Sequence, residues 1–298
     1  MKKLKGIVCV MCTPYKADES VDYDALRFNI GELLKRKNLG GIMINGGTGE
    51  FASLTEDERY KCAEVTAKEI DGRVPFVVGV TSESSMQAIK YAQHAESIGA
   101  DAVMMAPPPY CKPDWEMTLS HYKRVCASVK IPFMVYNNPG TTGVDINLEQ
   151  SVQLLSEIGN AVYYKESSGS LIRARNLKLE APPKTVVLSG WEDLALEHAM
   201  AGCEGWVCVM ANFAPDICIE LFEHTGNREW EKAFETYSKM LPALSMIESA
   251  GARMVQYTKY AMDLVGFIGA YNRGPRLELS QPEKDIIEAE VRKLGLYK

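Results

Sequence analysis

Short apolar runs alternate with helix-length segments through the first 225 residues, and few folds accommodate such an alternation. The runs predict eight strands, over residues 7–12, 41–44, 76–79, 102–105, 133–136, 162–165, 186–188 and 206–209. Helices are predicted between and after them, over residues 23–36, 56–70, 84–98, 116–128, 148–158, 171–177, 194–201 and 215–224. A (β/α)8 TIM barrel needs eight such units, whereas a doubly wound sheet more often stops at about five or six strands. We therefore expect an α/β barrel.

The pattern changes to helix alone after residue 226. Segments 228–249, 252–265 and 281–293 are predicted helical, and Pro242 is predicted to interrupt the first of them. No low-complexity linker precedes these helices. The expected organisation is a barrel over residues 1–225 that carries the active site, with a helical extension over residues 226–298 packed on it.

Bulk composition narrows the range of partners. A net charge of −6 and a pI near 5.4 argue against nucleic acid or an anionic membrane surface. No stretch approaches the roughly 18 apolar residues of a membrane span. The 8 cysteines are scattered, and the apolar run near the N-terminus is too short for a signal peptide. Reduced thiols and a cytoplasmic location are therefore expected.

Lys165 ends the sixth predicted strand, in the segment YYKESSG (163–169). A lysine in this place is either exposed to solvent where the strand ends, or buried with an amine that takes part in a reaction. A desolvated amine loses its proton more readily, and a neutral amine attacks carbonyl carbon. Tyr136 ends the fifth strand in the segment YNNP (136–139) and favours the second interpretation. Neighbouring strands deliver both side chains to one barrel mouth, where a phenol beside an amine can move protons.

The second strand is followed by the loop GGTGE (46–50). Its backbone N–H groups and the Thr48 hydroxyl suit a carboxylate or a phosphate. Such a loop can also be no more than a turn, so by itself it predicts little.

These motifs, with the Thr13-Pro14 opening and the Pro109-Tyr110 loop, resemble those of the dihydrodipicolinate synthase / N-acetylneuraminate lyase family of Schiff-base-forming lyases. The resemblance covers essentially the whole chain, including the helical tail. It implies an imine between Lys165 and the carbonyl of a 2-oxo acid, such as pyruvate or a 2-keto-3-deoxy acid. Tyr136 would transfer protons, and no cofactor would be needed beyond the covalent imine.

The resemblance also implies further site residues. Gly47, Thr48 and neighbouring amides would hold the substrate carboxylate. Tyr110 would reach into the site of a neighbouring subunit, which implies a homo-oligomer, either a dimer or a tetramer. The ends of the seventh and eighth strands supply the remaining predicted substrate-binding residues, Gly190, Glu192, Asp193 and Val207. For the acidic pair the alternative is that Asp193 caps the following helix and Glu192 is solvated.

Two positions depart from the family pattern. Position 47 is glycine, where the family usually has a Thr or Ser hydroxyl that links two tyrosines in a proton relay. The relay is then either bridged by water or absent. Position 141 is threonine, where dihydrodipicolinate synthases have an arginine for a substrate carboxylate, and a neutral hydroxyl does not replace a bidentate guanidinium. The predicted function is therefore a Schiff-base lyase or aldolase that acts on pyruvate or another 2-oxo acid.

Other functions stay open at this point. The chain could be a dehydratase or deaminase of the same family, for instance of 1-pyrroline-4-hydroxy-2-carboxylate, or a true dihydrodipicolinate synthase despite Thr141. A non-enzymatic 2-oxo acid sensor is a further alternative, because Gly47 breaks the expected relay. A metal-dependent aldolase is disfavoured, and no metal is predicted, since the 4 histidines (94, 121, 198 and 224) fall within predicted helices with no pair at ligand spacing.

Overall fold

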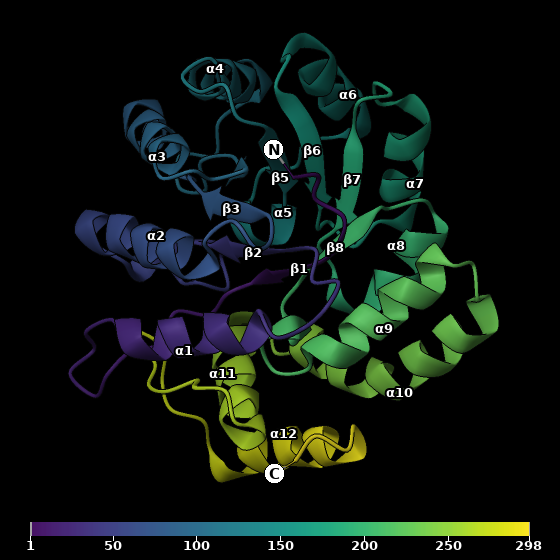
Figure 1. Ribbon diagram of the computed structural model, residues 1–298. Coiled ribbons are helices and arrows are strands. Elements are labelled where there is room, and N and C mark those ends of the chain that lie inside the picture. The colour runs from purple at the N-terminus through teal and green to yellow at the C-terminus, as the bar shows by residue number, and fades with distance from the viewer. Residues whose placement is uncertain (1, 298) are drawn as a thin grey trace.

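The computed structural model describes residues 2–297, and these form the expected TIM barrel with helices appended after it. Eight parallel strands close in chain order, with β8 hydrogen-bonded to β1. Figure 1 shows the strands at the centre and the helices around them. The described strands are β1 (Gly6–Val10), β2 (Gly41–Ile44), β3 (Phe76–Gly79), β4 (Ala102–Met105), β5 (Phe133–Asn137), β6 (Ala161–Glu166), β7 (Val186–Ser189) and β8 (Gly205–Cys208).

The strands are short buried runs because helices cover the outer face of the barrel and side chains fill its interior. β1 is shorter than predicted and ends at Val10. The reason is tertiary: the N–H of Cys12 donates to the side chain of Asn212 at 3.0 Å.

The barrel helices follow the predicted pattern closely. They are α1 (Tyr23–Leu33), α2 (Glu56–Ile70), α3 (Ser85–Ser97), α4 (Trp115–Cys126), α6 (Leu148–Glu157), α7 (Leu171–Glu180), α8 (Ala195–Met200) and α9 (Pro215–Gly226). The capping box predicted at the start of α2 is present, with the Thr55 side chain accepting from the N–H of Glu58 and the Glu58 side chain accepting from the N–H of Thr55.

Short helical turns at the strand ends were not predicted. They are η1 (Phe51–Ser53), α5 (Pro139–Thr142), η2 (Glu192–Leu194) and η3 (Met210–Asn212). In α5 the Asn138 side chain accepts from the N–H of Thr141, and Pro139 takes the first helical position. This pairing of an Asn cap with a following Pro is a helix-start signal that the sequence carried.

The extension packs on the barrel as α10 (Trp230–Ser249), η4 (Gly251–Arg253), α11 (Met254–Val265) and α12 (Gln281–Lys293). Figure 1 shows α10 outside α9, and α11 and α12 on the same side of the barrel as α1. The predicted interruption at Pro242 is wrong, because α10 runs through it. Pro242 and Ser238, whose carbonyl loses its usual N–H partner, both lie on the exposed face, where water can replace the missing donor.

The described helices include none that is long and apolar enough to cross a bilayer.

Candidate active site

A cavity of about 550 Å³ lies at the C-terminal ends of the strands, the face on which TIM barrels place their chemistry. It is lined by most of the predicted site residues, namely Lys165, Tyr136, Gly47, Thr48, Gly190, Glu192 and Val207. A larger hollow of about 660 Å³ lies around the residues that precede β1, β2 and β3 and contains none of them. The cavity at the C-terminal ends is therefore the candidate active site.

Lys165 lies inside this cavity and is only 6% exposed. Its Nζ is 4.1 Å from the centroid of the Tyr136 ring, because the two residues are paired across β5 and β6. The Tyr136 hydroxyl accepts a hydrogen bond of 2.8 Å from Nδ2 of Asn138. The predicted proximity of the lysine and the tyrosine is confirmed.

Gly190 follows β7 and leaves the space that the Lys165 side chain fills. A Cβ atom at position 190 would lie 2.6 Å from Cε of Lys165 and 1.9 Å from Oγ of Ser167. The Gly190 N–H donates to the carbonyl of Glu166 at 2.8 Å, and its carbonyl accepts from the Ser167 hydroxyl at 2.9 Å. Only glycine therefore allows β7 to approach the lysine this closely.

The loop after β2 closes on itself through hydrogen bonds from the N–H groups of Glu50 and Phe51 to Gly47 and Gly46. Among the described residues, the amides of Gly47 and Thr48 take no part in these backbone hydrogen bonds. Both residues line the cavity, and a Cβ at position 47 would meet nothing within 4 Å. The loop thus offers amide donors and the Thr48 hydroxyl to a small anion.

The two acids after β7 have different surroundings: Glu192 lines the cavity, as its predicted substrate-binding role requires, and Asp193 does not. Glu192 is 1% exposed rather than solvated, and its carboxylate accepts from the backbone amides of Val209 and Met210 at 2.8 and 3.0 Å. The indole of Trp206 adds a third contact at 3.3 Å. Burial raises the pKa of Glu192 to about 7, against the two amides, which lower it.

Asp193 is turned away from the cavity, which it does not line. It accepts from the indole of Trp191 at 2.8 Å and from the Ser245 hydroxyl at 3.3 Å. The alternative prediction, that Asp193 caps the next helix, is wrong, because the N-cap of α8 is Leu194 and has no side-chain cap. Asp193 instead joins the β7 loop to α10.

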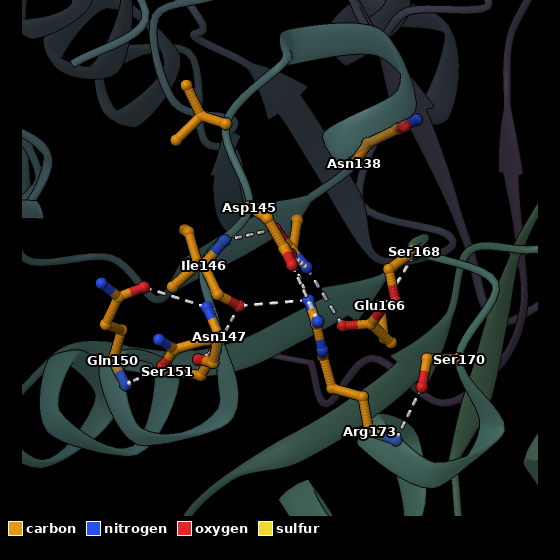
Figure 2. Close-up of polar contacts among 12 residues, drawn as sticks. Asn138, Asp145, Ile146, Asn147, Gln150, Ser151, Glu166, Ser168, Ser170 and Arg173 are labelled. Carbon is orange, nitrogen blue, oxygen red and sulfur yellow. Dashed lines mark hydrogen bonds and ion pairs between the residues drawn. The ribbon is translucent and has the colours of Figure 1, made fainter. Parts of the chain in front are cut away.

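A polar cluster behind the mouth holds the ends of β5 and β6 (Figure 2). Asn137 donates to Asp145 at 3.1 Å and to Glu166 at 3.5 Å, and Arg173 forms an ion pair with Asp145. The Arg173 hydrogen bond lowers the pKa of Asp145, whereas burial raises the pKa of Glu166. In Figure 2 Asn138, the N-cap of α5 just after the strand end, points away from this cluster. Asn137 therefore bonds to the polar cluster, and Asn138 bonds to the Tyr136 hydroxyl.

The extension supplies part of the cavity wall, which sequence reasoning missed. Residues from α10, η4 and α11 line it together with Arg276, and they are Glu248, Gly251, Ala252, Met254 and Val255. Nothing local marks them, since their approach to the mouth depends on how the extension packs. The cavity therefore spans both predicted parts of the chain.

Tyr110 is 90% exposed and does not line the cavity of its own chain. Its backbone N–H donates to Glu83 at 2.8 Å, which fixes the loop after β4. The ring is left projecting from the surface.

The four histidines lie in α3, α4, α8 and α9, as predicted. Burial lowers the pKa values of His121 and His198 to about 4. The described residues contain no group of three or more His, Cys, Asp or Glu side chains placed to hold a metal ion.

Comparison with known proteins supports this geometry. The model of the dihydrodipicolinate synthetase family matches residues 3–294. The chain belongs to this family. It is 30% identical to the 4-hydroxy-tetrahydrodipicolinate synthase of Methanopyrus kandleri over 99% of the chain and 97% of that protein. It is 32% identical to the enzyme of the same name from Bartonella bacilliformis, over 99% of both chains.

Solved structures of the dihydrodipicolinate synthetase family superpose well on the chain. Dihydrodipicolinate synthase from Aquifex aeolicus is 27% identical, with a TM-score of 0.93, over 98% of this chain and 99% of that one. A prophage protein of the family from E. coli K12, solved in complex with pyruvate, is 26% identical, with a TM-score of 0.93, over 98% of this chain and 99% of that one.

Membership of the dihydrodipicolinate synthetase family makes the chain a lyase and sets the sensor alternative aside. The two positions expected to depart from the family pattern are Gly47, in the anion-binding loop, and Thr141, in α5. Both positions face the cavity, so both departures bear on the substrate.

Proposed function

We propose that the protein is a Schiff-base lyase or aldolase that binds pyruvate, or a larger 2-oxo acid, as an imine on Lys165. The observation that carries this proposal is a buried lysine at the end of β6, with its Nζ 4.1 Å from the Tyr136 ring centroid. Gly190 has no Cβ and so leaves the space that the lysine side chain occupies. A lysine that reacts with a carbonyl needs no cofactor, because the imine itself accepts the electron pair.

The chemistry follows from these groups. The neutral amine of Lys165 attacks the C2 carbonyl, and the carbinolamine loses the former carbonyl oxygen as water. In the cleavage direction Tyr136 removes the proton of the C4 hydroxyl, the C3–C4 bond breaks, and its electron pair moves to the imine as an enamine. The C4 fragment leaves as an aldehyde, and Tyr136 returns its proton to C3 of the enamine. Hydrolysis of the resulting imine by water then releases pyruvate and restores the amine.

The rest of the cavity has supporting roles in this proposal. The free amides of Gly47 and Thr48 and the Thr48 hydroxyl bind the carboxylate next to the imine. Val207 supplies apolar wall at the end of β8 and is 1% exposed. Glu192 takes the role of a support for the β8 end, because its carboxylate is already bonded to that segment.

The relatives named 4-hydroxy-tetrahydrodipicolinate synthase make that condensation the second candidate. Thr141 weighs against it, since the cavity has a neutral hydroxyl where that reaction calls for a guanidinium. A dehydratase or deaminase would use the same imine and differ only in the bond broken next.

Trapping the imine tests the proposal. The protein is incubated with pyruvate and borohydride, and the reduced adduct is mapped by mass spectrometry. We expect one adduct, on Lys165, and none in Lys165→Ala. Tyr136→Phe is expected to slow turnover by about 10²–10⁴-fold, the range for lost acid–base catalysis. An adduct on another lysine, or no adduct, would falsify the proposal.

We also propose that Tyr110 completes the site of a second subunit. A tyrosine that is 90% exposed on a loop held by Glu83 is placed to contact another chain rather than its own cavity. Aromatic side chains are favoured at such contacts.

A further inference from the structure

The part of the cavity wall supplied by α10 contains a carboxylate that the proposed chemistry does not use. Glu248 lies in the last turn of α10, lines the cavity and is half-buried. Its Oε1 accepts from the backbone N–H of Glu192 at 3.0 Å. That contact fixes the carboxylate against the β7 end, so its position in the mouth does not depend on solvent.

Glu248 differs from Glu192 in what its oxygens are free to do. The carboxylate of Glu192 accepts hydrogen bonds from the backbone of Val209 and Met210 and from the indole of Trp206. The hydrogen bonds of the described residues include one to Oε1 of Glu248 and none to Oε2. A half-buried carboxylate oxygen beside a cavity accepts a hydrogen bond from whatever group the ligand presents there.

The electrostatics of this wall select against an anion. Glu192 and Glu248 are neighbours there, and Lys165 interacts with both of them. In the protonated imine with a 2-oxo acid, the positive charge on the Lys165 nitrogen lies next to the substrate's own carboxylate. Burial raises the pKa of both acids, that of Glu192 to about 7, so the negative charge here rests mainly on Glu248, and a carboxylate in the distal half of the substrate would meet it as a like charge.

Among the described residues, Arg276 is the other cation that lines the cavity; its Nη1 is already paired, whereas its buried Nε has no hydrogen-bond partner. Arg276 contacts Oε2 of Glu50 at 3.1 Å and donates to the Ser53 hydroxyl at 3.3 Å, beside the anion-binding loop. The remaining polar groups near α5 and the end of β6 are neutral, and they include Asn138, Thr141, Thr142 and Ser167.

We infer that Glu248 is a specificity-determining residue that binds a hydroxyl group in the distal half of the substrate, and that the substrate is a 2-oxo acid with a neutral, hydroxylated tail. This inference rests on the proposed imine at Lys165. It moves the role of hydroxyl acceptor from the acids after β7 to an acid of the helical extension, and so ties substrate choice to the packing of α10.

The test compares two 2-oxo acids in the cleavage direction. One is 2-keto-3-deoxygluconate, with a hydroxylated tail, and the other is 4-hydroxy-2-oxoglutarate, with a carboxylate tail. The wild-type protein is expected to prefer the hydroxylated acid. Glu248→Ala is expected to lower kcat/KM for that acid by about 10- to 100-fold, mainly through KM, because a hydrogen bond to a charged group is lost.

Two more variants make the result specific. Glu248→Gln keeps an acceptor without the charge and should lose only about three- to tenfold, since charge-assisted bonds are about twice as strong. It also replaces Glu248→Ala should that variant fail to fold. Glu235→Ala removes an exposed acid of the same helix, paired with Lys239 at 3.0 Å, and is the control expected to match wild type.

The inference is overturned if the wild-type protein prefers the carboxylate-tailed acid. It is also overturned if neither substitution at Glu248 changes kcat/KM for the hydroxylated acid. Failure of the underlying imine gives a different result, namely no borohydride-trapped pyruvate in the wild-type protein.

Discussion

At the scale of single residues, a glycine matters to the site as much as the residues with reactive side chains. Lys165 needs a pocket that excludes water yet leaves the amine free to react, and β7 provides it through Gly190. The same strand end bonds back to β6 through the carbonyl of Glu166. The lysine is thus held by backbone on one side and by the Tyr136 ring on the other.

Gly190→Ala should therefore separate the fold from the chemistry. The new methyl group must displace Cε of Lys165 or Oγ of Ser167. A displacement near 1 Å costs about 10²-fold in rate, so trapping of pyruvate should slow by at least about that factor. Gly159→Ala is the matched control, because a Cβ there meets nothing within 4 Å. Equal trapping rates in the two variants would contradict this account of Gly190.

At the scale of elements, a buried ion pair fastens α11 to the loop after β2. Nζ of Lys259 lies 2.7 Å from Oε1 of Glu50, with the side chains 1% and 0% exposed. Lys259 also donates to the carbonyl of Tyr271 at 3.0 Å. Burial lowers the pKa of Lys259, and Glu50 opposes that effect. The pair joins α11 of the extension to the anion-binding loop.

Lys259→Met should be strongly destabilising. It leaves a fully buried carboxylate with Arg276 as its remaining cation, and breaking a buried pair costs about 3–5 kcal/mol. Lys239→Met removes an exposed pair with Glu235, which is worth about 1 kcal/mol or less. The midpoints of denaturant unfolding measure both variants. A loss no larger for Lys259→Met than for Lys239→Met would show that the buried pair contributes little.

At the scale of the whole molecule, the exposed Tyr110 makes an isolated chain an incomplete enzyme under our proposal. A site assembled from Lys165 of one subunit and Tyr110 of the next can be rebuilt from two defective chains. Co-expression of Tyr110→Phe with Lys165→Ala should yield mixed oligomers more active than either variant alone. In such an oligomer one site combines an intact lysine with an intact tyrosine. Activity no higher than that of Tyr110→Phe alone would show that Tyr110 serves no neighbouring site.

Local patterns in the chain were enough to predict the barrel and its chemical centre. Strand and helix periodicities depend on neighbours within a few residues, so the alternation predicted all eight strands and the start of α2. Because parallel strands of a barrel end at one face, Lys165 and Tyr136 could be placed together before any coordinates. The short turn α5 was missed, although its Asn-Pro start was visible.

Contacts between distant segments decided the rest. Glu192 and Asp193 stand next to each other in sequence, yet one is buried against the end of β8 and the other bonds to α10. Glu248 lies 83 residues from Lys165 in the numbering and enters the same cavity only because the extension folds over the barrel mouth. Burial and hydrogen-bond partners are set by such packing, and no local period encodes them. The role of each acid therefore belongs to the tertiary structure.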